Sequence, residues 1–236
     1  MSVITVSRQF ASGGDEISRR VGEILGYRMF DKRLMARAAI DSGLSEQEIV
    51  DFSEDNYRVR GFLDRLFNRS QTISEARIWK EDPSGMRIVE GVKLSEDAAL
   101  VLVQNAIRSA HQAGNMIIIG RGGQVLLRDR PGVFHLRIIA PMEDRIQRMK
   151  TKIKTSPDAV PGDISPRHEA QDLLNRHDRA SEDYIHRFYH VSLDDPLLYH
   201  LVINTGYIPI DQGVQIIVDL VNELEKAYLI PEIDSA

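Results

Sequence analysis

Short apolar runs alternate along the chain with longer stretches in which apolar residues recur at helical spacing. The first run covers residues 3–6 and is rich in β-branched side chains, and a helical pattern over residues 13–26 follows it after a turn of small residues. Similar apolar runs predict further strands over residues 28–30, 115–120, 133–139 and 199–204. Continuous apolar strands separated by helices are typical of a sheet buried on both faces, so we expect an α/β fold with a parallel sheet of about five strands.

Helical spacing accounts for most of the chain between these strands. It predicts helices over residues 32–40, 54–69, 95–114, 143–153, 165–187 and 211–228, and shorter helices from Ser45 and up to about Arg128. Gly26 stands where a glycine C-cap is expected, and Asp31 stands at an N-cap position. Residues 71–94 show the weakest pattern, with a turn at residues 81–85, and we interpret them as a local insertion.

Composition narrows the classes of function. The chain has 236 residues, a formal net charge of -5 and a pI of about 5.8, which disfavours broad binding of nucleic acid. It has no cysteine, which excludes disulfides, thiol catalysis and cysteine-ligated metals. No apolar stretch reaches the roughly 18 residues of a membrane helix, and no signal peptide is visible, so we expect a cytoplasmic protein. The histidines lack zinc-ligand spacing, and no nucleophile motif such as G-x-S-x-G occurs.

The turn after the first apolar run carries the first sign of chemistry along the chain. It places Ser12, Gly13 and Gly14 between a predicted strand and a predicted helix. In this arrangement successive backbone N–H groups and the positive end of the helix dipole face one point, which favours a phosphate. A glycine turn is also an ordinary connection between a strand and a helix, and the sequence leaves that alternative open. In parallel sheets ligands bind beyond the carboxyl ends of the strands, where this turn would lie.

The turn departs from the Walker A pattern G-x-x-x-x-G-K-[ST] at the positions of its functional residues. With Gly13 as the second glycine, Arg8 stands at the first glycine, Gly14 at the lysine and Asp15 at the hydroxyl residue. Asp15 and Glu16 suit the first turn of a helix, and they would equally suit a Mg²⁺ ion held with a nucleotide. Arg8, at the mouth of the turn, is our candidate for the missing cation.

Arginines on other segments are candidates for contacts with phosphate oxygens. Arg121 follows a predicted strand between glycines, so the backbone there can approach a ligand closely. Two pairs of arginines lie on the predicted helices that flank residues 155–163: Arg145 with Arg148, and Arg176 with Arg179. The members of each pair share one helix face, as in a lid that closes over a polyphosphate. The alternatives are a structural salt bridge at Arg121 and a solvated basic face on the two helices.

Five runs of the sequence carry a resemblance to a known family. They are S-R-Q-F-A-S-G-G-D-E-I (7–17), F-D-K-R-L (30–34), I-I-I-G-R-G-G-Q-V-L-L (117–127), F-H-L-R-I-I-A-P (134–141) and L-Y-H-L-V-I-N-T-G (198–206). The chain resembles the cytidylate kinase-like family of P-loop nucleotide kinases, over most of its length and most weakly over residues 45–94. The resemblance implies a three-layer α/β/α sandwich of the nucleoside monophosphate kinase type with a small helical lid.

The same resemblance implies a division of the chain. Residues 1–230 would form a single P-loop kinase-like domain. Within it, residues 31–94 would form an acceptor-binding helical insertion, and residues 142–190 would carry the lid helices. Residues 231–236 would be a flexible tail.

Bacterial cytidylate kinases also suggest which residues lie near the two substrates. Asp31 and Arg37 match residues near their acceptor nucleotide. Their G-R-D motif after the third strand reads Gly120-Arg121-Gly122 here, so the arginine is kept and the acid is absent. Their lid motif is matched by Arg176, Asp178 and Arg179, but its later Asp and Arg fall at Ala180 and Asp183.

The residues and the resemblance together predict an ATP-dependent transferase that moves the γ-phosphoryl group to a nucleoside monophosphate, cytidylate-like, or to a related small acceptor. ATP and Mg²⁺ are implied by the resemblance, and no metal ligand is certain. The alternative is a catalytically impaired pseudokinase that binds a nucleotide or anion as a sensor or interaction protein. The acceptor and self-association into a homo-oligomer are left open. The candidate roles are catalytic for Arg8, Arg121, Arg176 and Arg179; nucleotide- or phosphate-binding for Ser12, Gly13, Gly14, Asp15 and Glu16; and acceptor-binding for Asp31, Arg37 and Asp178.

Overall fold

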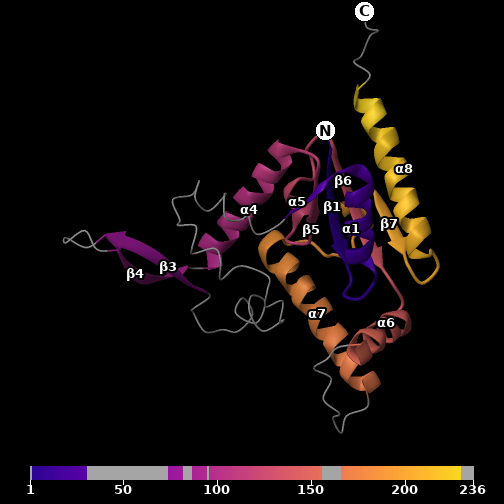
Figure 1. The fold of residues 1–236 in the computed structure, drawn as a ribbon, viewed down its shortest axis with the longest axis horizontal. Helices are drawn as coiled ribbons and strands as arrows, with labels where there is room; N and C mark the ends of the chain where they lie inside the picture. The colour runs from indigo at the N-terminus through magenta and orange to yellow at the C-terminus, as the bar shows by residue number, and fades with distance from the viewer. Residues whose placement is uncertain (1, 31–73, 82–86, 95, 156–165, 230–236) are drawn as a thin grey trace, which may run out of the picture. The chain divides into compact units, whose positions relative to one another are not determined.

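The computed structural model describes residues 2–30, 74–81, 87–94, 96–155 and 166–229 (Figure 1). The chain divides into two compact units, Met1–Met29 with Gly114–Ala236, and Phe30–Ala113. Several predicted features lie outside the described residues: the helices over 32–40 and 54–69 and from Ser45, the tail 231–236, and the acceptor-binding candidates Asp31 and Arg37.

The first unit is built on a five-stranded sheet. Its strands are β1 (Val3–Arg8), β2 (Arg28–Met29), β5 (Met116–Ile119), β6 (Val133–Ile139) and β7 (Leu201–Asn204). Their spatial order is β2-β5-β1-β6-β7, and the pairings between them are parallel. The predicted α/β fold with a parallel sheet of this size is therefore confirmed.

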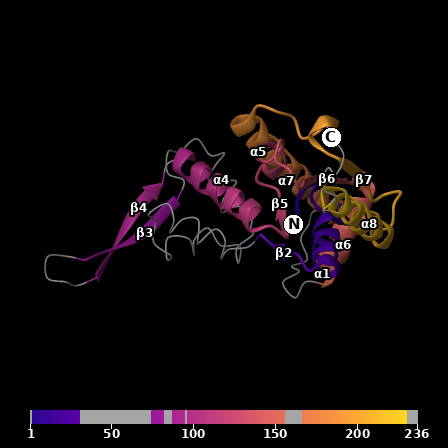
Figure 2. The ribbon, with the colours of Figure 1, turned by 90° about the horizontal axis from the view of Figure 1, so that it is seen from above.

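Helices cover both faces of this sheet. They are α1 (Gly14–Leu25), α5 (Gly123–Leu126), α6 (Met142–Thr155), α7 (Pro166–Tyr189) and α8 (Ile210–Leu229), with the 3₁₀ helix η3 (Pro196–Leu198) before β7. Figure 2 shows α1 and α8 together on one side of the sheet and α5 on the other. The helices predicted over 13–26, 143–153, 165–187 and 211–228 are confirmed, and Gly26 forms the expected left-handed C-cap of α1 with φ of 68°.

The alternation of side chains along β1 explains this arrangement. Ile4 and Val6 lie in the apolar core that side chains from α1 and α8 complete. Thr5 faces the opposite side, where a Cβ added to Gly123 at the start of α5 would lie 3.3 Å from its Cγ2 atom. The connections from the neighbouring strands β1 and β5 therefore leave toward opposite faces. In open α/β sheets this divergence marks the edge where ligands bind.

The second unit contains α4 (Glu96–Ala113) and an antiparallel hairpin of β3 (Ser74–Glu81) and β4 (Arg87–Leu94). The helix confirms the prediction over residues 95–114, and its apolar positions Val103, Ile107 and Ala110 are buried. The sequence does not predict the hairpin, because charged residues and a glycine interrupt the apolar alternation that marks a strand. Its register pairs Ser74 with Leu94.

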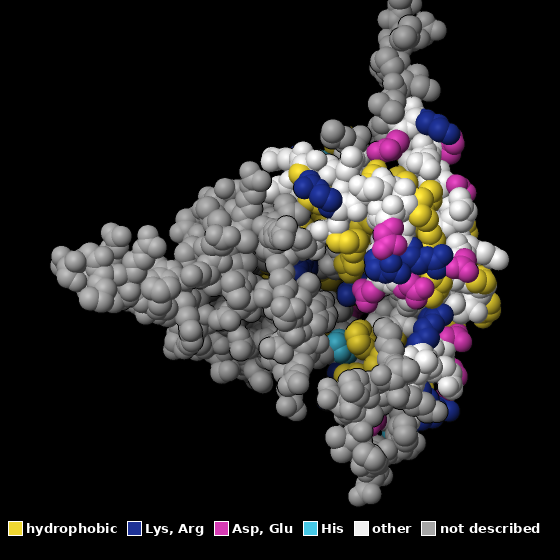
Figure 3. Space-filling view, in the orientation of Figure 1, with side chains coloured by type: hydrophobic (Ala, Val, Ile, Leu, Met, Phe, Trp, Pro, Cys, Tyr) yellow, Lys and Arg dark blue, Asp and Glu magenta, His cyan; other side chains and the backbone are white. Residues whose placement is uncertain are grey.

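The surface over α1 carries charges of both signs (Figure 3). Arg20 pairs with Asp211 at 2.6 Å and lies 3.7 Å from Glu16, and Arg19 pairs with Glu23 at 2.5 Å. The described residues of this face therefore form no continuous basic stripe of the kind that tracks a nucleic acid. No described helix combines the length and the apolar character needed to span a membrane.

His135 of β6 is a titratable group inside the sheet. Only 2% of its surface is exposed, and its Nδ1 atom lies 2.6 Å from Thr5 Oγ1. Its backbone N–H donates to His200 Nδ1 at 3.0 Å. Burial, and then the neighbouring His200, lower the pKa of His135 from 6.5 to about 4. The imidazole is therefore neutral in the folded protein at physiological pH.

This lowered pKa predicts a loss of stability in mild acid. Between the pKa of 6.5 in the unfolded chain and about 4 in the folded chain, only the unfolded state binds the proton, so the free energy of unfolding falls as the pH falls. We expect His135 to contribute about 2 kcal/mol to the difference between pH 7 and pH 5. Urea unfolding of the wild type and of His135→Asn would measure it, with the exposed His186→Gln as control. An unchanged difference in His135→Asn would contradict the prediction.

Candidate phosphate-binding site

The turn between β1 and α1 has the backbone geometry of an anion-binding site. The Ser12 N–H donates to the Gln9 carbonyl at 3.2 Å, and α1 begins where the Ile17 N–H donates to the Gly13 carbonyl at 3.0 Å. Ala11 and Gly13 have left-handed backbone angles, with φ of 59° and 87°. Successive N–H groups in such a turn point toward one side instead of alternating.

The N–H groups at the start of α1 are available to a ligand. Among the described residues, the backbone N–H groups of Gly13, Asp15 and Glu16 donate no hydrogen bond. The Gly14 N–H makes only a long contact of 3.4 Å with Ser12 Oγ. These are the donors that a helix start leaves unsatisfied, and they carry the positive end of its dipole. Their convergence suits an anionic group such as a phosphate.

Arg8 lies against the first turn of α1. A Cβ added to Gly14 would lie 2.7 Å from Arg8 Cβ and 2.9 Å from Arg8 Cγ, closer than side-chain atoms pack. Arg8 Nε donates to Asp15 Oδ1 at 2.9 Å, and the Arg8 side chain is 20% exposed. Its NH1 atom lies 3.5 Å from the place of a Cβ on Gly120. The guanidinium group therefore lies between the glycine turn and the loop that follows β5.

That loop carries the candidate Arg121. Gly120, Arg121 and Gly122 follow one another in left-handed conformations, with φ of 68°, 58° and 75°. The Gly120 N–H donates to the Val6 carbonyl at 2.9 Å, which ties the loop to β1. A Cβ on Gly122 would overlap the ring of Tyr189 on α7, and the left-handed backbone at Gly122 also favours glycine. The fold thus brings the loop with Arg121 to the same edge of the sheet as the glycine turn.

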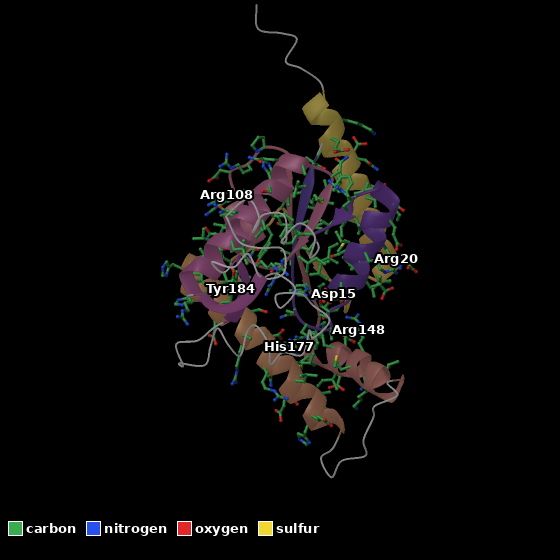
Figure 4. The ribbon with its side chains drawn as sticks, turned by 60° about the vertical axis from the view of Figure 1, so that its left-hand side comes forward. Asp15, Arg20, Arg108, Arg148, His177 and Tyr184 are labelled. Atoms are coloured by element: carbon green, nitrogen blue, oxygen red, sulfur yellow. The ribbon has the colours of Figure 1, made fainter. Side chains whose placement is uncertain are left out.

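Arg148 of α6 and Thr205, which follows β7, hold the outer side of the turn. Arg148 NH1 and NH2 donate to Thr205 Oγ1 and to the Thr205 carbonyl, each at 3.0 Å. Arg148 NH1 also lies 3.4 Å from the Ala11 carbonyl oxygen, and Thr205 Oγ1 donates to the Ser12 carbonyl at 2.5 Å. Figure 4 shows Arg148 on the side of the molecule where α1 begins. Arg148 therefore braces the turn through its backbone.

The other predicted lid residues divide into two sets. Arg145 NH1 donates to Asp178 Oδ2 at 2.5 Å, and Asp178 Oδ1 accepts from the Phe10 N–H at 3.1 Å. Both carboxylate oxygens of Asp178 are thus engaged within this chain, and its role toward an acceptor stays a prediction. Arg176 and Arg179 are exposed. At about 100° per residue they lie on the side of α7 away from Phe10, and the structure does not bring them to the turn.

His177 stacks on Phe10 with ring centroids 3.7 Å apart and planes inclined by 6°. Burial lowers the pKa of His177 to about 4, although the charge of Asp178 acts in the opposite direction. The imidazole is therefore neutral at physiological pH and acts here as an aromatic surface. Figure 4 places His177 on α7 near the glycine turn.

The sequence places Thr205, which follows the last predicted strand, at this edge of the sheet, but it does not identify His177 or Arg137 as part of this region. Arg137 is 6% exposed on β6, and its NH1 atom donates to Ser7 Oγ, near the end of β1, at 2.8 Å. An arginine inside a mostly apolar strand is a signal that could have indicated a buried polar contact. The strand register, which pairs Ser7 with Arg137, identifies this partner, and Arg137 NH2 also donates to Asp194 Oδ1 at 3.3 Å.

A cradle of N–H groups at a helix start, beside an arginine-bearing loop at the carboxyl edge of a parallel sheet, is an arrangement in which α/β proteins bind phosphate groups. The family can be stated as well. The chain belongs to the cytidylate kinase-like family, whose profile matches residues 3–207. This membership indicates a nucleotide-binding phosphotransferase.

Solved structures share the fold at low sequence identity. An uncharacterized protein from Eubacterium ventriosum is 14% identical and superposes with a TM-score of 0.59, covering 94% of this chain and 99% of its own. A shikimate kinase from Acinetobacter baumannii, solved in complex with shikimate, is 13% identical with a TM-score of 0.42, covering 94% of each chain. The first superposition supports the fold assigned above.

Among characterised proteins, a uronate isomerase from Corynebacterium glutamicum is 29% identical over 103 residues. The match covers 44% of this chain and 18% of that protein, so the chain spans less than a fifth of its length. A match of this extent carries no activity over to this chain.

Proposed function

We propose that this protein transfers the γ-phosphoryl group of ATP to a nucleoside monophosphate or a related small acceptor. Ser12, Gly13 and Gly14 with the N–H groups of Asp15 and Glu16 would hold the phosphates of ATP. Phosphoryl transfer requires a protein to position its substrates and to neutralise charge, with little covalent chemistry of its own. The described site offers N–H donors and guanidinium groups, which serve these two purposes.

The observation that carries the proposal concerns positions 8 and 14. Compared with the Walker A pattern, the glycine and the cationic residue stand at each other's positions. The Walker A pattern has glycine at the first of these positions and lysine at the second, and this chain has arginine and glycine. Because a Cβ on Gly14 would lie 2.7 Å from Arg8 Cβ, only one of the two positions has room for a side chain. The side chain of Arg8 therefore starts beside the place where a side chain at position 14 would start. Arg8 thus supports phosphate binding where the pattern would use lysine.

The residues present fit ATP with a Mg²⁺ ion that the nucleotide brings. Among the described residues, no group of three or more His, Cys, Asp or Glu side chains could hold a metal ion by itself. Asp15 and Glu16 are exposed at the start of α1 and would add carboxylate ligands to such an ion. When bound, Mg²⁺ would supply positive charge that offsets the charge of the phosphate groups.

The remaining candidate roles complete this proposal. Arg121 would grip the transferred or accepted phosphate with its planar guanidinium group. Arg176 and Arg179 would act as lid cations, which requires a closed arrangement different from the one described. Asp31 and Arg37 would lie near the acceptor. We place the activity in the cytoplasm, where ATP and monophosphates are both present.

A coupled assay of ADP release tests the proposal directly. The purified protein would be given Mg-ATP and a panel of nucleoside monophosphates and other small phosphate acceptors, with cytidylate included. ADP release that depends on one acceptor, with the phosphorylated product identified by mass spectrometry, is the expected result. Binding of Mg-ATP without turnover on any acceptor would contradict it.

Arg8→Ala is expected to weaken binding of Mg-ATP about tenfold, because hydrogen bonds to charged groups contribute roughly 1.5–3 kcal/mol and Arg8 shares its charge with Asp15. Isothermal titration calorimetry would measure the affinity, and the coupled assay would measure turnover. Arg19→Ala, which removes an exposed arginine of α1 paired with Glu23, is the matched control. Unchanged affinity and turnover in Arg8→Ala would rule out Arg8 as the substitute for the lysine.

A pseudokinase that senses a nucleotide or anion is the second candidate function. The ion pair between Arg8 and Asp15 favours it, because an arginine already paired with a carboxylate is less available to a phosphate. The same titration and assay separate the two functions. Nucleotide binding without turnover would support the sensor, and a protein that binds no nucleotide at all would be neither.

A further inference from the structure

Phe10, in the middle of the glycine turn, is held by α6 and α7 from several directions. Asp178 Oδ1 accepts from the Phe10 N–H at 3.1 Å, and Arg145 NH1 lies 3.4 Å from the Phe10 carbonyl oxygen. The Phe10 ring stacks on His177 at a centroid distance of 3.7 Å. Both polar groups of one backbone unit, and its side chain, are thus fixed by two helices far away in the sequence.

The ion pair behind this contact is shielded from water. The side chain of Arg145 is 5% exposed and that of Asp178 is 27% exposed, and they meet at 2.5 Å. A buried arginine without a charged partner is strongly destabilising. Separating Arg145 from Asp178 would therefore be costly, and the ion pair keeps the Asp178 carboxylate in place. The carboxylate in turn accepts the Phe10 N–H, and a hydrogen bond to an ionised acceptor is stronger than one to a neutral group.

Apolar side chains reinforce the same junction. A small core of Ile146 and Met149 from α6 with Ala170 and Leu174 from α7 packs against Phe10 and Ala11 of the turn. Ala11 has a left-handed backbone, which a non-glycine residue adopts only where its surroundings require it. The surroundings here are the two helices predicted to carry the lid. The part of α6 and α7 that forms this small core therefore also supports the glycine turn.

We propose that Asp178, held by Arg145, is a positioning residue that fixes the turn so that the N–H groups of residues 13–16 converge on one point. The proposal rests on the function proposed above and assigns to Asp178 a role through Phe10, separate from contact with an acceptor. Donors that are already fixed lose little freedom when the phosphate arrives, and this raises affinity.

Hydrogen exchange of the turn, measured by mass spectrometry, tests the positioning role without any ligand. Asp178→Ala is expected to accelerate exchange of the hydrogen-bonded amides of Phe10 and Ser12 at least about tenfold, because the Phe10 N–H loses its acceptor. Asp178→Asn keeps an acceptor oxygen and is expected to show a smaller increase. Asp183→Ala removes an exposed acid from the same helix and should leave the turn unchanged. Unchanged exchange in Asp178→Ala would overturn the proposal.

Removing Asp178 alone leaves Arg145 buried and unpaired and could prevent folding, so a second variant is included. Replacement of a buried ion pair by apolar groups is often tolerated. Arg145→Met/Asp178→Leu is therefore expected to fold, to lack the acceptor for the Phe10 N–H, and to show the same accelerated exchange. Protected amides in this folded double variant would also overturn the proposal.

Titration with Mg-ATP then separates this proposal from the proposed function. Asp178→Ala is expected to weaken Mg-ATP binding about tenfold, with a smaller loss in Asp178→Asn and none in Asp183→Ala. If the wild type binds no Mg-ATP, the proposed function fails, and the exchange measurement still decides the role of Asp178. If the turn loosens while affinity for Mg-ATP stays unchanged, the link between positioning and phosphate binding is refuted.

Discussion

Gly14→Lys is expected to destabilise the protein, although it introduces the residue that the Walker A pattern has at this position. A Cβ at position 14 would lie 2.7 Å from Arg8 Cβ, and neither atom is the mobile end of a side chain. Either β1 or the start of α1 must therefore shift. Overpacking of this kind costs about 1–3 kcal/mol, and the shift falls on the N–H groups of the cradle. Thermal unfolding should show a lower melting temperature, and calorimetry a loss of Mg-ATP affinity of about tenfold or more.

The double variant Arg8→Gly/Gly14→Lys tests the exchange of side chains itself. It removes both Arg8 Cβ and Arg8 Cγ, restores the glycine and lysine of the Walker A pattern, and is expected to recover most of the stability and Mg-ATP affinity. Glycine at the end of β1 is itself destabilising, so the recovered free energy of unfolding is expected to be smaller by about 0.5–1 kcal/mol. Arg8→Ala/Gly14→Lys is the matched control, because it keeps the Cβ that causes the overlap. Two results would show that the overlap of Cβ atoms does not explain the residues found at positions 8 and 14. One is equal recovery of stability and Mg-ATP affinity in both double variants, and the other is a Gly14→Lys protein as stable as the wild type.

The sequence predicts the sheet well because its strands are buried on both faces. Ile4 and Ile117 are fully buried neighbours in β1 and β5, and continuous apolar runs of this kind are typical of strands in a parallel sheet. The glycine turn could be predicted equally well, because two glycines stand directly before the abrupt start of a helical pattern. In the structure Gly13 has the positive φ that glycine readily adopts. The position of the candidate site at the carboxyl edge follows from these two observations.

The side chains that hold the turn could not be predicted in the same way. Arg148 contacts Thr205, and Asp178 contacts Phe10, across separations that no local pattern spans. Helical spacing places Arg145 and Arg148 on one face of a helix, but it does not identify what faces them. A partner within the chain and a bound phosphate both satisfy a guanidinium group, and in the structure Arg145 has the partner within the chain.

Arg121 differs from these arginines because its backbone conformation is strained, which is a second indication of its role. Its φ of 58° is left-handed, which costs an L residue with a Cβ about 1–2 kcal/mol. Glycines stand on both sides of it, so a third glycine would meet the same backbone without strain. Strain that persists at a residue in a candidate site is a reason to infer function.

Arg121→Gly is therefore expected to lose turnover while it gains stability. Loss of a donor aimed at developing charge lowers kcat by about 10²–10³-fold, and relief of the left-handed strain should raise the free energy of unfolding by about 1 kcal/mol. The coupled ADP-release assay and urea unfolding would measure the two effects. Arg121→Ala keeps the strain and should lose turnover without the gain in stability. Arg121→Lys keeps the charge but not the planar group and should fall between the wild type and Arg121→Ala in turnover.

The opposite result would identify a structural arginine. If Arg121 serves a salt bridge to a neighbouring loop, Arg121→Gly removes a stabilising contact, lowers the free energy of unfolding and leaves the turnover of the remaining folded protein unchanged. The two readings thus differ in the sign of the change in stability as well as in the change in activity. If glycine at position 121 gives a more stable protein, the arginine must serve a purpose other than stability. The proposed purpose is to bind a phosphate group at the edge of the sheet.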